Sequence, residues 1–320
     1  MRFGNLVLFK HNLKRLSGMI TGYVDPNRDS NLPPKRVEGD ISIGEDLFAS
    51  TRIGNERKNQ EDAVLIMRNS DNPKYKMMVV ADGVGGSELG ERASDLCVSS
   101  LREWFKSLTV EDFKEEELLI RRLQRKLDRI NTDIRELGSS AETTLVAAIV
   151  ADRHTYVLNI GDSRAYMISG KEFIQISSDD SLAQIYYNNG AIKTRDDMRF
   201  SMVSNVITNS LGGDRVNVTP NINVCPNDAY DAILLFSDGV TDCLSDDQIY
   251  AVSKKTSPKK LAQKIVEKAL KTKSVRKAKR TDQITFTKVI KPGKDNTTAA
   301  VMLNKNKKGR RTWWKMMFLK

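Results

Sequence analysis

Short apolar runs, each ended by Gly, Asp or Asn, recur along the chain and predict strands buried in a sheet. They lie at residues 77–81, 144–151, 155–160, 231–237 and 298–303. Between the first two runs, residues 93–108 and 119–137 place apolar side chains at helical spacing instead. Another helix is expected after Ser257, with Pro258 in its first turn. Strands, then a helix pair, then more strands indicate an α+β protein rather than alternating βαβ units.

The two ends of the chain differ from this folded pattern. Residues 1–41 join a basic and apolar start to the turn-rich stretch DPNRDSNLPPK, so we expect an N-terminal extension before a domain of 42–303. No run approaches the ~20 apolar residues of a membrane span, and no small-residue cleavage site of a signal peptide is present. The three cysteines have no close spacing, which excludes a disulfide framework or zinc cluster and predicts a cytoplasmic protein.

Charge is divided unevenly along the chain. Residues 254–320 hold 22 Lys and Arg against 3 Asp and Glu, whereas residues 1–253 hold 30 against 38. The tail 304–320 also follows its cationic run with Trp, Met and Phe, a pattern that suits an anionic membrane surface. It equally suits nucleic acid or an acidic partner, or a solvated tail that folds back on the domain. The sequence leaves these alternatives open.

Four aspartates stand where apolar runs end, at positions that a sheet holds rigidly. They are Asp62, Asp82, Asp238 and Asp295. Each Asp-Gly pair among them could be an ordinary turn, but the repeated arrangement predicts a carboxylate cage for a hard cation. Oxygen-only ligands fit Mg²⁺ or Mn²⁺ rather than zinc.

The order of the motifs around these aspartates is more specific than any one of them. Taken together, they resemble the type 2C metal-dependent serine/threonine protein phosphatases, in a form closest to the bacterial branch, over residues 42–303. The motifs are Arg57-x-x-x-Glu61-Asp62, ADGVGG (81–86), ETTLVAA (142–148), GDSRAY (161–166), NVITNSLGG (205–213), LLFSDGVTD (234–242) and KDNTTAAVM (294–302).

The resemblance implies a four-layer α-β-β-α sandwich of two antiparallel sheets, with two Mn²⁺ or Mg²⁺ ions at one end. It implies that Asp82 bridges both ions, that Gly83 offers its carbonyl to one, and that the other three aspartates complete the site. Asp162 and Asp242 match positions that help hold a third ion. We expect Glu61 and Asn296 to support the neighbouring ligands.

The chemistry implied is direct attack of a metal-bridging water on a phosphoserine or phosphothreonine ester. Arg57 matches the family's phosphate-binding arginine, and its planar guanidinium can hold two phosphate oxygens. Taken alone, Arg57 could equally be a surface arginine. The substrates would be phosphorylated proteins, with a cognate kinase as the opposing enzyme and a monomer as the expected state.

Four features need separate comment, and two of them, Val84 and Asp180, depart from the family's motifs. Val84 stands where many eukaryotic relatives carry a proton-donating histidine, so the general acid is unassigned. Asp180 replaces the histidine of a common bacterial Asp-His-Ser motif at the start of the expected flap, 177–204, and we expect it to affect substrate choice. Residues 271–294 are an expected basic insertion. The fourth feature, His154, is expected as a solvated turn residue.

The main alternative to a phosphatase is a catalytically silent relative that acts as a binding module. The complete set of ligand positions argues against it. Docking to a membrane or to nucleic acid through residues 254–320 would be an added function of either protein.

Overall fold

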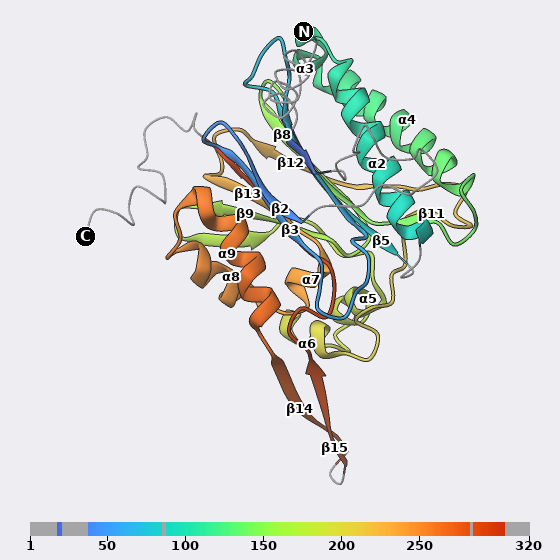
Figure 1. The fold of residues 1–320 in the computed structure, drawn as a ribbon, viewed down its shortest axis with the longest axis vertical. Coiled ribbons are helices and arrows are strands. Elements are labelled where there is room, and N and C mark those ends of the chain that lie inside the picture. Colours follow the sequence, from blue (N-terminus) through green and yellow to red (C-terminus); the bar gives the residue numbers. More distant parts are fainter. Residues whose placement is uncertain (1–17, 21–37, 85–87, 282–283, 305–320) are drawn as a thin grey trace, which may run out of the picture.

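The computed structural model describes residues 18–20, 38–84, 88–281 and 284–304, with the backbone alone at 18–20 and 274–288. Two antiparallel sheets form its centre (Figure 1). In the first, β1 (Gly18–Ile20), β4 (Asp62–Arg68), β5 (Lys76–Val84), β7 (Leu145–Val150), β8 (His154–Ile160) and β12 (Asn221–Pro226) follow in spatial order, with β6 (Glu142–Thr143) and β11 (Leu211–Gly212) at its edge. The second runs β10 (Glu172–Gln175), β9 (Arg164–Ser169), β13 (Ala232–Phe236), β16 (Thr297–Leu303), β3 (Leu47–Arg52) and β2 (Gly39–Ile43).

Helices cover the outer face of each sheet, which completes the predicted four layers (Figure 1). The first sheet is covered by α2 (Glu88–Lys106) and α4 (Glu116–Arg135), which α3 (Val110–Lys114) connects. The second is covered by α8 (Asp246–Ser253) and α9 (Pro258–Lys271). Shorter helices α5 (Leu182–Asn188), α6 (Arg195–Phe200) and α7 (Asp238–Thr241) lie near the end of the sandwich.

The central strands are mostly apolar because both of their faces are buried. In β4, Leu65 packs toward the helices of the first layer, whereas the adjacent Val64 packs between the sheets. In β13, Leu234 faces α9 and Leu235 faces the first sheet. Neighbouring strand residues point to opposite faces, so a strand covered on both sides has few polar positions away from its ends. The predicted strands and three helices are confirmed, and α9 begins at Pro258 after Ser257 as expected.

The N-terminal and basic segments contribute strands of their own. Within residues 1–41, β1 pairs with β4 and β2 begins at Gly39, so both sheets recruit this stretch. The basic insertion contains a hairpin of β14 (Ser274–Thr281) and β15 (Ile284–Ile290), which stands away from the body (Figure 1). Residues 305–320, most of the expected tail, lie outside the described part of the chain.

His154 is not the solvated turn residue expected from the sequence. Its Nδ1 lies 2.6 Å from Oε2 of Glu116, a carboxylate that is almost fully buried at the start of α4. Burial alone would raise the pKa of Glu116, but hydrogen bonds from His154 and from the backbone amides of Arg153 and His154 outweigh it and lower that pKa. This pair holds α4 against the beginning of β8.

The cysteines behave as expected, because Cys97, Cys225 and Cys243 are buried and form no disulfide. Within the described residues, none of the helices combines the length and the apolar character that crossing a bilayer requires.

Candidate metal centre

Both sheets bring their aspartates to the same end of the sandwich. Asp62 begins β4 and pairs in register with Asp82 near the end of β5. In the other sheet, Asp238 directly follows Ser237 at the end of β13, and Asp295 comes just before β16, the neighbour of β13. The four positions predicted from the ends of apolar runs are therefore adjacent strand ends.

Hydroxyl groups hold Asp62 from the opposite sheet. Its Oδ2 accepts hydrogen bonds from Ser237 Oγ at 2.8 Å and Thr298 Oγ1 at 2.6 Å. Thr298 Oγ1 lies 2.7 Å from Oγ1 of Thr51, which in turn accepts from Gln60 Nε2 at 2.9 Å. Sequence reasoning did not single out these hydroxyls, although Ser237 and Thr298 lie within the SDG and NTT motifs.

The backbone around Asp82 is fixed just as closely. Its amide donates to Thr144 Oγ1 at 3.1 Å, and its carbonyl accepts from Thr143 Oγ1 at 3.0 Å. A Cβ on Gly83 would lie 2.3 Å from the carbonyl oxygen of Gly90, so only glycine lets α2 approach the end of β5 this closely. The Gly83 position is thus required by packing as well as by the motif.

Burial and neighbouring carboxylates raise the pKa of Asp82 and of Asp238. Burial raises the pKa of Asp82 well above its usual range, and the charges of Asp62 and Asp238 add to the effect. Burial likewise raises the pKa of Asp238, together with the charges of Asp295 and Asp242. Clustered carboxylates without a counter-ion are unfavourable, so this end of the molecule is poised to bind cations.

The Asp238 carboxylate has an oxygen that is not satisfied by the described part of the chain. Oδ1 of Asp238 is buried and accepts no hydrogen bond from the described residues. A buried, unsatisfied carboxylate oxygen is costly unless it binds a cation. The described residues contain no group of three acidic, His or Cys side chains that together surround one ion, so a backbone carbonyl such as that of Gly83, or water, would complete the ligand set. An all-oxygen donor set with an unsatisfied atom fits Mn²⁺ or Mg²⁺.

Arg57 lies at the rim of this cluster rather than on open surface. Its Nη2 donates to Asp295 Oδ2 at 2.6 Å, and its Nη1 lies 3.8 Å from Glu61 Oε2. The hydrogen bond to Asp295 raises the pKa of Arg57, so the guanidinium remains charged. Asn296 joins the two loops, since its Oδ1 accepts from the Glu61 amide at 2.8 Å and its Nδ2 donates to Asn59 O at 3.0 Å.

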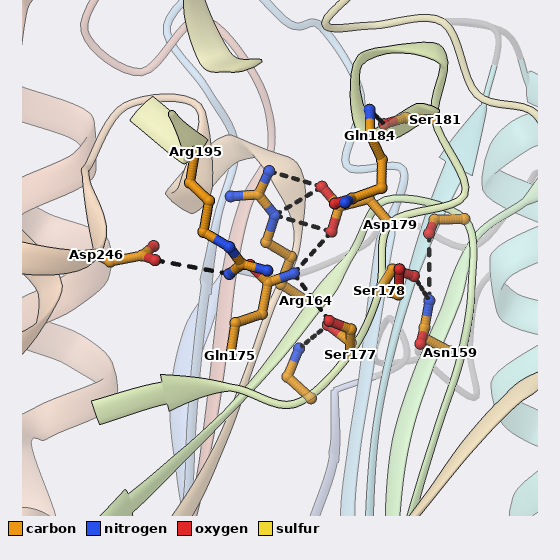
Figure 2. Close-up of polar contacts among 12 residues, drawn as sticks. Asn159, Arg164, Gln175, Ser177, Ser178, Asp179, Ser181, Gln184, Arg195 and Asp246 are labelled. Carbon is orange, nitrogen blue, oxygen red and sulfur yellow. Dashed lines mark hydrogen bonds and ion pairs between the residues drawn. The ribbon is translucent and has the colours of Figure 1, made fainter. Parts of the chain in front are cut away.

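The two expected third-ion residues lie beside the flap. Burial raises the pKa of Asp162 to about 7, and the charges of Asp179 and Asp242 add to this while Arg164 opposes it. Figure 2 shows the guanidinium of Arg164 directed at Asp179, with contacts of 2.6 to 3.0 Å. This buried ion pair ties the GDSR turn to the first residues of the flap.

Asp180 anchors three segments, a role that its sequence position did not indicate. Its Oδ2 accepts from the Gly161 amide at 3.1 Å and from Asn209 Nδ2 at 3.0 Å, and its Oδ1 accepts from Asn221 Nδ2 at 2.9 Å. Gly161 directly precedes Asp162. Asp180 therefore supports the acidic cluster, and not only the expected flap.

A two-sheet sandwich that gathers buried carboxylates and an arginine at one end defines a metal-dependent phosphatase domain. Comparison with known proteins agrees, because residues 52–273 match the family described as protein phosphatase 2C. The chain belongs to the protein phosphatase 2C family.

Its relatives include bacterial serine/threonine phosphatases. The serine/threonine phosphatase stp of Listeria monocytogenes serotype 4b is 32% identical over 211 residues, which cover 64% of this chain and 81% of that protein. The solved structure of Stp1 from Staphylococcus aureus superposes with a TM-score of 0.68 at 25% identity, over 85% of this chain and 99% of that one. The PstP catalytic domain, solved with two manganese ions, gives 0.61 at 25% identity, over 80% and 96%.

Proposed function

We propose that this protein hydrolyses phosphoserine and phosphothreonine in other proteins with the help of two Mn²⁺ or Mg²⁺ ions. Its family makes it a metal-dependent protein-serine/threonine phosphatase. The observation that carries the proposed site is the buried Oδ1 of Asp238, which accepts no hydrogen bond from the described residues and lies among carboxylates that raise the pKa of Asp238. Manganese in the PstP structure supports Mn²⁺ as one choice of ion.

Each residue of the cluster has a proposed role. Asp82 would bridge the two ions, Gly83 would offer its carbonyl, and Asp62, Asp238 and Asp295 would complete the ligand set. Asp162 and Asp242 would hold a third, weaker ion. When bound, the ions would lower the pKa of the attacking water and offset the negative charge that develops on the phosphoryl group.

The remaining steps fall to side chains of this protein. Arg57 would bind two phosphoryl oxygens and orient the ester for in-line attack. To do so its guanidinium must exchange the Asp295 carboxylate for the phosphate, which carries more charge. Val84 has no proton to give, and the described histidine, His154, begins β8 at the end opposite Asp162. The leaving alcohol would therefore take its proton from water.

Partners and location beyond this remain proposals. Phosphorylated proteins as substrates imply an opposing kinase, and a monomeric, cytoplasmic protein remains our prediction. Docking to an anionic membrane or to nucleic acid through residues 254–320 is likewise untested, because the aromatic part of the tail lies outside the described residues.

The proposed function predicts phosphate release that depends on added metal. With MnCl₂, the protein should release phosphate from phosphothreonine and phosphoserine peptides, and EDTA should abolish the release because the carboxylates alone cannot activate water. Excess Mn²⁺ should restore it. Malachite-green detection of phosphate measures the rate. If neither Mn²⁺ nor Mg²⁺ supports release, the silent binding module becomes the better account.

A further inference from the structure

Helices α8 and α9 lie side by side in the layer that covers the second sheet (Figure 1). A basic hollow lies between them. It has a volume of about 430 Å³. Ala251 and Val252 contribute apolar surface to it, and Glu267 pairs with Lys264 at 2.7 Å on its wall. We call this hollow the α8–α9 groove, which is lined by Ala251, Val252, Lys255, Thr256, Lys264, Glu267, Lys268, Lys271 and Thr272.

The lysines of the α8–α9 groove are not neutralised by the protein itself. Among the described residues, Lys255, Lys268 and Lys271 have no ion-pair partner, and Lys264 alone is paired, to Glu267. Lys264, Lys268 and Lys271 follow one face of α9 at i, i+4 and i+7, where like charges repel and destabilise a helix. A negatively charged ligand in the groove would relieve this repulsion.

The end of the α8–α9 groove adjoins the loops of the metal centre. Leu270, next to Lys271, packs against Gly293: a Cβ there would lie 3.0 Å from Leu270 Cδ2. The carbonyl of Gly293 accepts from the Asn55 amide at 2.5 Å. Arg57 and Asp295 each follow two residues later along these loops. A protein segment that leaves the groove at this end is directed toward the phosphate-binding arginine.

The shape and lining of the groove distinguish among anionic ligands. A bilayer surface is too broad to fill a hollow between two helices, whereas a peptide side chain can occupy it. Its apolar lining from Ala251 and Val252 suits an aliphatic side chain better than a nucleic-acid backbone. The chemistry therefore favours a peptide that combines Asp or Glu with an apolar residue.

We propose that the α8–α9 groove docks an acidic, partly apolar segment of the phosphorylated substrate, away from the phosphate itself. This rests on the proposed phosphatase function. Residues 1–253 carry an acidic excess, and the carboxylate cluster repels acidic substrates. A basic docking site at the edge of this region would concentrate such substrates next to Arg57.

Peptide binding to the α8–α9 groove can be measured separately from phosphate release. A fluorescein-labelled, unphosphorylated peptide in which Glu and Asp flank two leucines should bind the full-length protein in an anisotropy titration, and its Gln/Asn analogue should not. The variant Lys268→Glu/Lys271→Glu should weaken binding about tenfold or more. The control Lys259→Glu/Lys260→Glu makes the same charge change on the first turn of α9, outside the groove, and should leave binding within about twofold.

Steady-state kinetics then tests whether docking in the groove promotes hydrolysis of the substrate. For a phosphothreonine peptide that carries the acidic segment, kcat/KM should fall about tenfold in Lys268→Glu/Lys271→Glu, mainly through KM. Hydrolysis of a small aryl phosphate by the same variant should match the wild type. Inactivity of the wild type on both substrates would count against the phosphatase function alone, since peptide binding is measured separately.

Three results would overturn the docking proposal. In the first, the acidic peptide does not bind the wild type. In the second, it binds both charge variants as well as the wild type does. In the third, phosphatidylserine vesicles or a single-stranded oligonucleotide, but not the peptide, bind in a way that Lys268→Glu/Lys271→Glu abolishes.

Discussion

Asp238→Asn lowers the kcat of Mn²⁺-dependent phosphate release by about 10³-fold or more. The asparagine keeps the shape of the side chain but replaces a charged oxygen that has no protein partner. Loss of one charge from the ligand set weakens both metal binding and the stabilisation of developing phosphoryl charge. Steady-state kinetics on a phosphothreonine peptide at saturating Mn²⁺ measures the effect.

A measurement of Tm shows that the loss of activity in Asp238→Asn is not due to unfolding. Burial and neighbouring carboxylates raise the pKa of Asp238, so its ionised form destabilises the metal-free fold above the pKa of the unfolded chain. Asp238→Asn removes this charge and should raise Tm in EDTA at pH 7. The exposed Asp247, on α8, provides the control Asp247→Asn, which should alter neither activity nor Tm. Full activity in Asp238→Asn would show that the metal assignment is wrong.

Arg57→Ala lowers kcat/KM about 100-fold, and Arg57→Lys still loses about tenfold. A lysine keeps the charge but cannot bind two phosphoryl oxygens through a planar group. The rim position beside Asp295 and Glu61 means that the guanidinium is within reach of anything bound to the carboxylates. Kinetics over a range of substrate concentration separates the expected rise in KM from the fall in kcat.

The control for this series is a more exposed arginine on an outer helix. Arg121 on α4 makes a 3.8 Å surface pair with Glu117, and Arg121→Lys should leave kcat/KM unchanged. Equal kcat/KM for wild type and Arg57→Lys would mean that the arginine supplies charge alone. An unchanged kcat/KM in Arg57→Ala would show that Arg57 is a surface arginine with no part in phosphate binding.

Local pattern was sufficient to predict an α+β protein and the acidic positions, whereas the four layers were predicted only from the resemblance to the phosphatase family. Strands covered on both faces leave unbroken apolar runs, so the ends of those runs mark the ends of the sheets, and Asp62 and Asp82 prove to be register partners. The helix pair of the first layer followed from its spacing. These features depend on neighbours along the chain, which a sequence displays directly.

Contacts between distant segments were not predictable in the same way. The hydroxyls of Ser237 and Thr298 reach Asp62 across the two sheets, and nothing in their spacing indicates the approach. The Glu116 carboxylate contacts His154 from another layer. For this reason a histidine that was expected at the solvated surface has a structural role. Asp180 was recognised as a departure from the motif. Its hydrogen bond from the Gly161 amide forms only when the folded chain brings these two distant segments together.

The location of bound manganese tests most directly the central claim, which is that the four aspartates and Gly83 hold two metal ions. Crystals of the protein soaked in MnCl₂ should show two strong anomalous peaks among Asp62, Asp82, Gly83, Asp238 and Asp295, and Asp238→Asn crystals soaked in the same way should lose or weaken at least one of them. An anomalous map without peaks at these carboxylates, from protein that releases phosphate in the same buffer, would contradict the account.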